Sequence, residues 1–497
     1  MKQSEAKPRT VAQALFVGSV YMLVMRWAMR LMGLVSTVIL ARLLTPADFG
    51  LVAVATVFQG LLEVVVSLNV ELALFRSSHT DRNFYDTAWT ISIIQFALLS
   101  ALLLASAHWV SIYYADARLA PIIHVFSLSL LAFGFTNIGI VDFRRDLEFR
   151  KDLQFNLLVN ASRVVVSIVS AFLLRNYWAI VIGMVASTLT RVALSYVMSE
   201  YRPRFSLRRV GEIWNISVSV WLIDLSKFLD MSADRLILGR LAGARILGGY
   251  SVAVDLARMP SAEMIMPITR ALIPGYAKIR FDVQEVRRIS INLFHAVAVI
   301  AMPIAWGLPI ISPDLVSVVF GDKWLFIIPF MRIAAVMGVV ELIGLSARPL
   351  ILAAGDIKRF THVSLIGTAV GLSSIYPAYR LHGVELVLVT LVFVRFTILL
   401  VVFYLCTQIL QISYRDILKP FLSPLLAGSA MFCVLAFLDL GWFPAAARLF
   451  IDIALGALAY VLVLLLLWRL SGGAPAVMQL ALDQIGNSIL RWRRARS

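Results

Sequence analysis

The chain has 497 residues, of which 60% are hydrophobic and 15% are charged, and its mean hydropathy is +0.87. A soluble globular protein of this composition would have more apolar surface than its interior could bury, so that class is excluded and a membrane protein with many spans is predicted. In such a protein the formal net charge of +16 reflects basic loops, and we expect no nucleic-acid partner.

About 20 apolar residues cross a hydrocarbon core as a helix, and apolar segments of that length recur along the chain with short breaks. We therefore predict an all-α, polytopic fold with about fourteen membrane helices. The predicted spans cover residues 14–40, 47–70, 87–112, 119–141, 153–174, 178–199, 213–238, 247–270, 288–312, 325–346, 360–380, 384–410, 418–438 and 447–469. Because no room remains for a sizeable soluble domain, the function is expected within the membrane.

The loops between these spans differ in their basic content. Loops on the side of the two termini hold about 27 Lys and Arg residues, whereas the alternate loops hold about 8. Basic loops stay in the cytoplasm. Both termini are therefore predicted to be cytoplasmic.

A stretch near the start of the chain recurs in its middle. Residues 41–55 read ARLLTPADFGLVAVA and residues 239–253 read GRLAGARILGGYSVA, in register without a gap. Gly50 of the first stretch aligns with Gly248 of the second. In membrane transporters such repeats usually place the substrate path between the two halves.

The repeat predicts how the chain is divided. We expect an N-terminal six-helix lobe at 1–209, a second six-helix lobe at 210–412, two further membrane helices at 413–472 and a basic C-terminal segment at 473–497. In this last segment apolar residues share one helical face, and arginines cluster at its end. It is interpreted as an amphipathic helix on the inner membrane surface, with a frayed, solvated tail as the alternative.

The first two predicted spans carry charges on helical faces that are otherwise polar. In the first span Arg26 and Arg30 lie four residues apart, within a stripe of about 60°. In the second span Glu63 shares a face with Thr56 and Gln59. These faces are expected to border water or charged partners rather than lipid.

The seventh span is apolar enough to cross a bilayer, yet it carries five charged residues. At about 100° per residue they fall within an arc of roughly 140°, so they form one polar stripe. Each charge facing hydrocarbon would cost about 2.5–3.5 kcal/mol, which predicts a hydrated cavity or close partners. The residues of the stripe are Asp224, Lys227, Asp230, Asp234 and Arg235.

Other charges lie within the remaining spans. Asp255 and Arg258 of the eighth span are three residues apart and can pair locally. His295 is expected to be a packed residue rather than a switch. A further set is expected mostly to be satisfied locally or to reach toward an interface, and it comprises Arg163, Arg191, Arg332, Glu341 and Arg395.

Four segments carry a resemblance to a known family. They are ARLLTPADFGLVA at 41–53, its echo at 239–253, VDFRRDLEFRK at 141–151 and VVFGDKW at 318–324. With about fourteen spans, the sequence resembles the polysaccharide transporter branch of the multidrug/oligosaccharidyl-lipid/polysaccharide exporter superfamily. Members of that branch are bacterial flippases for lipid-linked sugar repeat units.

The resemblance implies two six-helix bundles that work by alternating access, with two peripheral C-terminal helices. The implied cargo is an undecaprenyl-diphosphate-linked oligosaccharide, moved from the cytoplasmic to the outer leaflet of the bacterial inner membrane. The product would serve exopolysaccharide, capsule or O-antigen synthesis. Implied partners are membrane lipid, a polysaccharide polymerase and export machinery, and no cofactor or metal is expected.

The diphosphate of such a cargo gives the intramembrane cations a role. Guanidinium groups bind phosphate oxygens through forked, charge-assisted hydrogen bonds. We therefore expect Arg26, Arg30 and Lys227 to form the cationic surface that meets the diphosphate. The alternative is that the two arginines only neutralise Glu63 or Asp224, because buried charges are normally paired.

The intramembrane acids have two open interpretations. Glu63 is either a counter-ion for the arginines or a site for a proton or cation, and pairing is the commoner role of carboxylates in membranes. The same choice between counter-ion and ion coupling applies to the other residues of this set, which are Asp224, Asp230, Asp234, Asp255 and Arg258.

Two other functions compete with the flippase prediction. A cation-coupled multidrug exporter of the same superfamily would be expected to have an acidic cavity, whereas here Arg26, Arg30 and Lys227 accompany the acids. A membrane-embedded glycosyltransferase or polymerase would be expected to carry a sizeable outward loop with catalytic acids. The outward loops predicted here are short, and the chain has no GxxxxGK[ST] phosphate loop for ATP hydrolysis.

Overall fold

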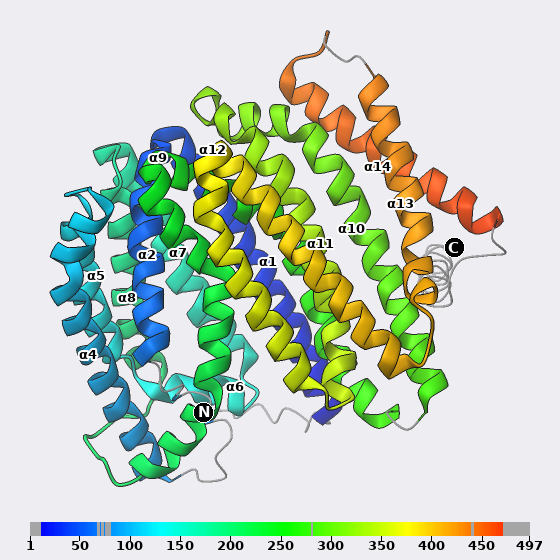
Figure 1. Ribbon diagram of the computed structural model, residues 1–497. Coiled ribbons are helices and arrows are strands. Elements are labelled where there is room, and N and C mark those ends of the chain that lie inside the picture. The colour runs from blue at the N-terminus through cyan, green and yellow to red at the C-terminus, as the bar shows by residue number, and fades with distance from the viewer. Residues whose placement is uncertain are drawn as a thin grey trace, which may run out of the picture. The chain divides into compact units, whose positions relative to one another are not determined.

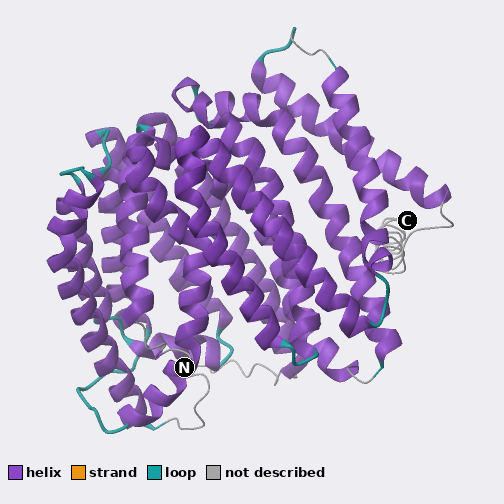
Figure 2. Ribbon diagram, in the orientation of Figure 1, coloured by secondary structure: helices purple, strands orange, loops and turns teal. Residues whose placement is uncertain are grey.

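The computed structural model describes residues 11–66, 70, 74, 81–279, 282–438 and 442–470. Over these residues the regular elements are helices joined by short loops, which confirms the predicted all-α fold (Figure 2). The predicted amphipathic segment at 473–497 lies outside the described residues.

The chain divides into two compact units, Met1–Gly248 and Gly249–Ser497. In the first unit α7 packs against α1 and α8, and α4 packs against α5 (Figure 1). Its elements are α1 (Val11–Leu43), α2 (Pro46–Val66), α4 (Arg82–Tyr114), α5 (Leu119–Gly134), η1 (Ile138–Val141), α6 (Asp142–Arg145), α7 (Phe149–Leu174), α8 (Trp178–Met198) and the first part of α9 (Val210–Ile279).

In the second unit α10 packs against α11, α13 and α14, and α11 packs against α12. Its elements are the rest of α9, α10 (Val283–Val319), η2 (Asp322–Ile327), α11 (Ile328–Ala353), α12 (Ile357–Leu410), α13 (Tyr414–Phe437) and α14 (Ala445–Leu470). The predicted lobes begin and end where the sequence repeats, whereas contacts group the first part of α9 with the preceding helices.

Two of the helices are broken. In α9 the break is at Gly243, with φ 76°, and in α12 it is at His382 and Gly383, with φ 66° at the glycine. Glycine tolerates a positive φ because it has no Cβ. The described residues contain twelve α-helices of 16 residues or more, and the two breaks divide them into fourteen segments, which overlap the fourteen predicted spans.

Length and composition identify the helices that can cross a membrane. Within the described residues ten helices qualify, with α12 counted once in spite of its break. An eleventh is added if Leu119–Gly134 and Ile138–Arg145, which meet at a bend of 74°, form one span.

The start of α2 follows from the sequence TPAD at 45–48. The side chain of Asp48 accepts hydrogen bonds from the backbone N–H of Thr45 at 2.8 Å and from its hydroxyl at 2.6 Å. Pro46 occupies the first helical position, where its missing N–H costs nothing. The other oxygen of Asp48 accepts the backbone N–H of Tyr177 at 3.1 Å, so the same carboxylate also fastens α2 to the start of α8.

The two aligned stretches of the repeat meet each other in the first unit. A Cβ built on Gly50 would overlap the backbone carbonyl of Ala244, and a Cβ built on Gly248 would overlap that of Pro46. Ala244 aligns with Pro46 in the repeat, so the contact is reciprocal. The start of α2 and the segment of α9 after Gly243 therefore cross backbone to backbone, which only glycine allows.

The segment that follows α8 is bound to α4. Asp86 of α4 is buried, and its carboxylate accepts the hydroxyl of Tyr201 and, at 2.8 Å, the backbone N–H of Arg204. Burial and the hydrogen bond to Asp86 both raise the pKa of Tyr201, so this phenol stays neutral and donates. Further along, the ring of Phe205 lies 5.0 Å from that of Trp89.

The last two helices belong to the core of the second unit. Figure 1 shows α13 and α14 beside α10, and residues of all three helices share one buried apolar cluster. The hydroxyl of Tyr460 on α14 donates to the carbonyl of Val299 on α10 at 2.9 Å. Near the other end of α10, Asp314 pairs with Arg448 of α14.

Candidate functional site

The predicted arginines of the first span lie on α1. Arg26 and Arg30 are four residues apart on one helical face, and both are partly exposed. Between them in sequence, the backbone carbonyl of Met29 accepts a hydrogen bond from Asn160 of α7 at 3.5 Å. This contact ties the cationic part of α1 to α7.

The part of α9 before Gly243 is bound to the first unit along one face. The indole N–H of Trp221 donates to the carbonyl of Val65 on α2 at 3.2 Å, and the ring of Phe228 lies beside Gly60. Further along, the hydroxyl of Tyr114 on α4 donates to the carbonyl of Leu236 at 3.0 Å.

The charged stripe of α9 is centred on a different face. At about 100° per residue, Trp221, Phe228 and Leu236 span about 80° of the helix, and the middle of the stripe lies well outside that arc. Lys227, near the middle of the stripe, and Asp230, at the edge farthest from that arc, are exposed. Asp224 is partly exposed, and Asp234 is only 5% exposed.

The contacts between α2 and α9 bring predicted acids to one level. Because Gly60 lies beside Phe228 and Val65 is bonded to Trp221, the two helices run side by side in opposite directions over this stretch. Glu63 lies between Gly60 and Val65 and is partly buried. It is therefore level with Asp224 of the charged stripe.

In the second unit the structure joins charges from three helices. Glu341 of α11 accepts a hydrogen bond from Arg258 of α9 at 2.7 Å and also pairs with Arg395 of α12. Both arginine side chains are 14% exposed and Glu341 is 22% exposed. Asp255, one turn from Arg258, is exposed.

The sequence interpretation did not predict this three-helix cluster. The sequence predicts that Glu341 and Arg395 are satisfied locally or reach toward an interface, and the structure pairs them with each other across α11 and α12. A usable signal existed, because a lone carboxylate in one apolar span requires a cation from elsewhere.

Other expectations about intramembrane groups are confirmed. The guanidinium of Arg163 donates to Asn160 on its own helix at 2.8 Å. His295 is buried, and its Nδ1 lies 2.7 Å from the carbonyl of Pro420.

Comparison with known sequences identifies relatives in bacterial polysaccharide synthesis. The lipopolysaccharide biosynthesis protein WzxC of Escherichia coli (strain K12) is 25% identical over 325 residues, which are 63% of this chain and 64% of that protein. The teichuronic acid biosynthesis protein TuaB of Bacillus subtilis (strain 168) is 23% identical over 422 residues, or 81% of this chain and 85% of TuaB.

Comparison with solved structures identifies the fold. The lipid II flippase MurJ, in an inward closed conformation, matches with a TM-score of 0.71 and 14% identity, covering 91% of this chain and 99% of MurJ. The model of the family described as "Polysaccharide biosynthesis protein" matches residues 39–329, more than half of the chain. The chain therefore belongs to the polysaccharide biosynthesis protein family, as a multi-pass membrane transporter with a MurJ-like fold rather than an enzyme.

Proposed function

We propose that this protein is a flippase for an undecaprenyl-diphosphate-linked oligosaccharide. It carries the repeat unit from the cytoplasmic to the outer leaflet of the bacterial inner membrane by alternating access, with both termini in the cytoplasm. Membership of the polysaccharide biosynthesis protein family and the MurJ-like fold support this proposal. The polymer would be an exopolysaccharide, a capsule or an O-antigen.

The observation that carries the proposal is the set of cations on α1 and α9. Arg26 and Arg30 share one face of α1, and Lys227 is exposed on α9, all within segments that cross the membrane in our interpretation. A cation in hydrocarbon is costly, so its retention points to an anion that it meets. The diphosphate of a polyprenyl carrier supplies such an anion, and a guanidinium can bind its oxygens in a fork.

The acids of α2 and α9 have a supporting role in the proposal. Glu63 is level with Asp224 on the neighbouring helix, and Asp230 and Asp234 continue the stripe. When no cargo is bound, these carboxylates can neutralise the cations, and a diphosphate would displace them. A second role, in which Glu63 takes up a proton or sodium ion that drives transport, fits the same positions.

The second unit carries intramembrane charges of its own. Arg258 is held by Glu341, and Asp255 is exposed one turn away on α9. We assign Arg258 and Asp255 to counter-ion or ion-coupling roles. A polysaccharide polymerase and the export machinery would then consume the flipped unit.

A drug exporter of the same superfamily is the alternative function. Its cargo would be an amphipathic cation, for which a purely acidic stripe is expected. The presence of Arg26, Arg30 and Lys227 favours an anionic cargo instead.

The test is translocation by the purified full-length protein in vesicles. A lipid-linked oligosaccharide with a labelled sugar is placed in the membrane, and its access to an external sugar-modifying reagent is followed. We expect the protein to speed exchange between leaflets, and an imposed sodium or proton gradient identifies the coupling ion. Transport of cationic dyes without oligosaccharide exchange would contradict the proposal in favour of the drug exporter.

A further inference from the structure

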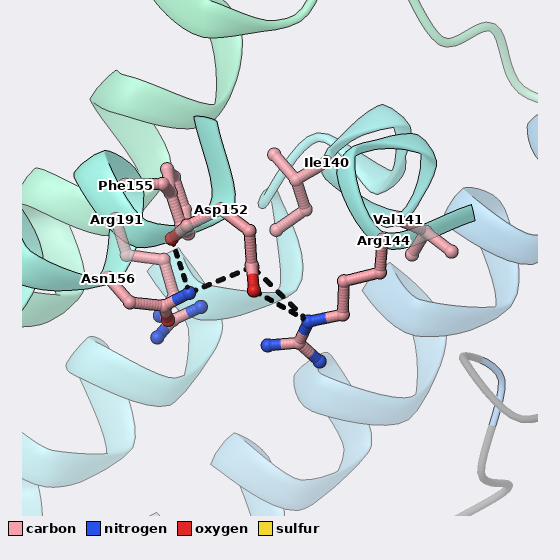
Figure 3. Close-up of a pocket in the computed structure, with 7 residues that line it drawn as sticks. All are labelled: Ile140, Val141, Arg144, Asp152, Phe155, Asn156 and Arg191. Carbon is pink, nitrogen blue, oxygen red and sulfur yellow. Dashed lines mark hydrogen bonds and ion pairs between the residues drawn. The ribbon is translucent and has the colours of Figure 1, made fainter. Parts of the chain in front are cut away.

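A small polar pocket lies in the first unit, lined by residues of other elements than α1 and α9. Its cavity volume is about 30 Å³, and the pocket opens to solvent. Side chains from η1, α6, α7 and α8 form its wall (Figure 3). The lining residues are Ile140, Val141, Arg144, Asp152, Phe155, Asn156 and Arg191.

One guanidinium in this pocket is held by a buried carboxylate. Nε of Arg144 lies 3.2 Å from each oxygen of Asp152, which is 5% exposed. The amide nitrogen of Asn156 also donates to Asp152, at 2.9 Å. The carboxylate is thus satisfied from two sides and fixes the direction of Arg144.

The terminal nitrogens of Arg144 remain available. Only Nε is bonded to Asp152 (Figure 3), and no residue in the described part of the chain accepts a hydrogen bond from the terminal nitrogens. The side chain is 43% exposed. The two terminal nitrogens of Arg144 can therefore donate hydrogen bonds to a ligand, and the bond between Nε and Asp152 fixes their direction.

The second guanidinium is held by aromatic rings. Arg191 lies 5.3 Å from the ring centre of Phe155 and 5.9 Å from that of Phe133. At these distances the ring faces attract the cation and orient it without neutralising its charge. With Arg191, Arg144 and Asp152, the pocket has two positive charges and one negative charge.

The depth of the pocket matches the headgroup region of a bilayer. α7 has 26 residues and is about 39 Å long at 1.5 Å per residue, whereas a hydrocarbon core is about 30 Å thick. Asp152 and Asn156 lie in the first two turns of α7. Arg191 precedes the end of α8 at Met198 by about 10 Å. All three residues are thus near one surface of the membrane.

We propose that this pocket binds the phosphate of an anionic phospholipid headgroup in the leaflet next to α6. A phosphate oxyanion would accept hydrogen bonds from the terminal nitrogens of Arg144, and Arg191 would add a second positive charge. Basic pockets between membrane helices on the cytoplasmic side commonly bind anionic headgroups. The assignment does not depend on the flippase proposal, because none of the pocket residues belongs to α1, α2 or α9.

The test is a titration of the purified full-length protein with dioleoylphosphatidylglycerol, followed by native mass spectrometry. Arg144→Gln is expected to weaken binding of the first lipid about tenfold or more, because a charge-assisted hydrogen bond is lost. Arg150→Gln is the matched control. It removes the same charge six residues further along the chain, at an exposed position of α7 outside the pocket, and should change the affinity by less than about twofold.

Folding and the source of the phosphate are tested separately. If Arg144→Gln misfolds because Asp152 is left unpaired, Arg144→Gln with Asp152→Asn removes both charges and should show the same loss of binding. Unchanged affinity in the folded variant would overturn the proposal. So would displacement of the lipid by millimolar inorganic phosphate, which indicates a free-phosphate site, or selective binding of a polyprenyl diphosphate, which indicates a cargo site.

Discussion

At the scale of single residues, the sequence predicted which side chains are unusual but not all of their partners. Arg26 and Arg30 stand out because a charge in an apolar segment is costly wherever the segment lies. The partner of Glu341 was not predictable in this way. Arg258 and Arg395 are distant in sequence from Glu341, and only the folded second unit brings α9, α11 and α12 together around it.

The first prediction concerns the arginines of α1. Arg26→Ala with Arg30→Ala is expected to reduce oligosaccharide translocation in vesicles about 100-fold, because each change removes a charge-assisted hydrogen bond to the diphosphate. The protein should still be inserted and folded. Arg163→Ala is the control, since Arg163 is bonded to Asn160 on its own helix. Equal losses in both variants would argue that any arginine in a span is required, without a role at the diphosphate.

The second prediction concerns Glu341. Glu341→Gln leaves Arg258 and Arg395 without their shared carboxylate, and it should lower the free energy of unfolding by about 3 kcal/mol or more. The measurement is the midpoint of thermal unfolding in detergent. Asp356→Asn breaks the pair with Arg359, which is 65% exposed, and should have an effect of less than about 1 kcal/mol. Similar midpoints for the two variants would contradict a structural role for the cluster.

At the scale of elements, close approach and capping decide where helices lie. The start of α2 could be predicted from TPAD at 45–48, because a proline at the first helical position and an acid three residues after Thr45 are helix-start signals. The attachment of residues 199–209 to α4 could not be predicted from the sequence. It depends on Asp86, and nothing in the sequence around Asp86 indicates that the backbone N–H of Arg204 donates to it.

The third prediction tests the crossing of α2 and α9. Gly50→Ala inserts a Cβ where the carbonyl of Ala244 lies, so the helices must separate, at a cost of about 1–3 kcal/mol or more. The expected result is a lower thermal midpoint and a lower yield of folded protein. Gly344→Ala is the control, because the nearest atom to its Cβ would be a methyl of Leu399 at an ordinary 3.9 Å. A Gly50→Ala protein as stable as Gly344→Ala would show that the crossing can relax.

The fourth prediction tests the attachment of the segment after α8. Asp86→Ala removes the acceptor for Tyr201 and for the backbone of Arg204, so this segment should detach from α4. Trypsin should then cut after Arg204 several-fold faster. Asp116→Ala, which breaks an ion pair with the neighbouring Arg118, should leave that rate unchanged. An unaltered rate in Asp86→Ala would mean that the remaining contacts hold the segment.

At the scale of the molecule, the number and spacing of the helical segments could be predicted. The reason is that each helix that crosses the bilayer needs about 20 mostly apolar residues, and these are visible in the sequence. The contacts between the segments could not be predicted. The first part of α9 reads as the start of a second repeat, yet its contacts through Trp221 and Tyr114 join it to the first unit. Such contacts depend on which helix faces meet, and hydropathy carries no information about that.

The reciprocal contact of Gly50 and Gly248 fixes how α2 and α9 are each rotated about their own axes. Each of the two helices supplies a glycine and also the carbonyl that the glycine of the other helix faces, as in an isologous dimer interface. Inserting one residue between Pro46 and Gly50 would turn the glycine by about 100° around the helix axis. Both close approaches would be lost together, so this part of the chain tolerates neither added nor deleted residues.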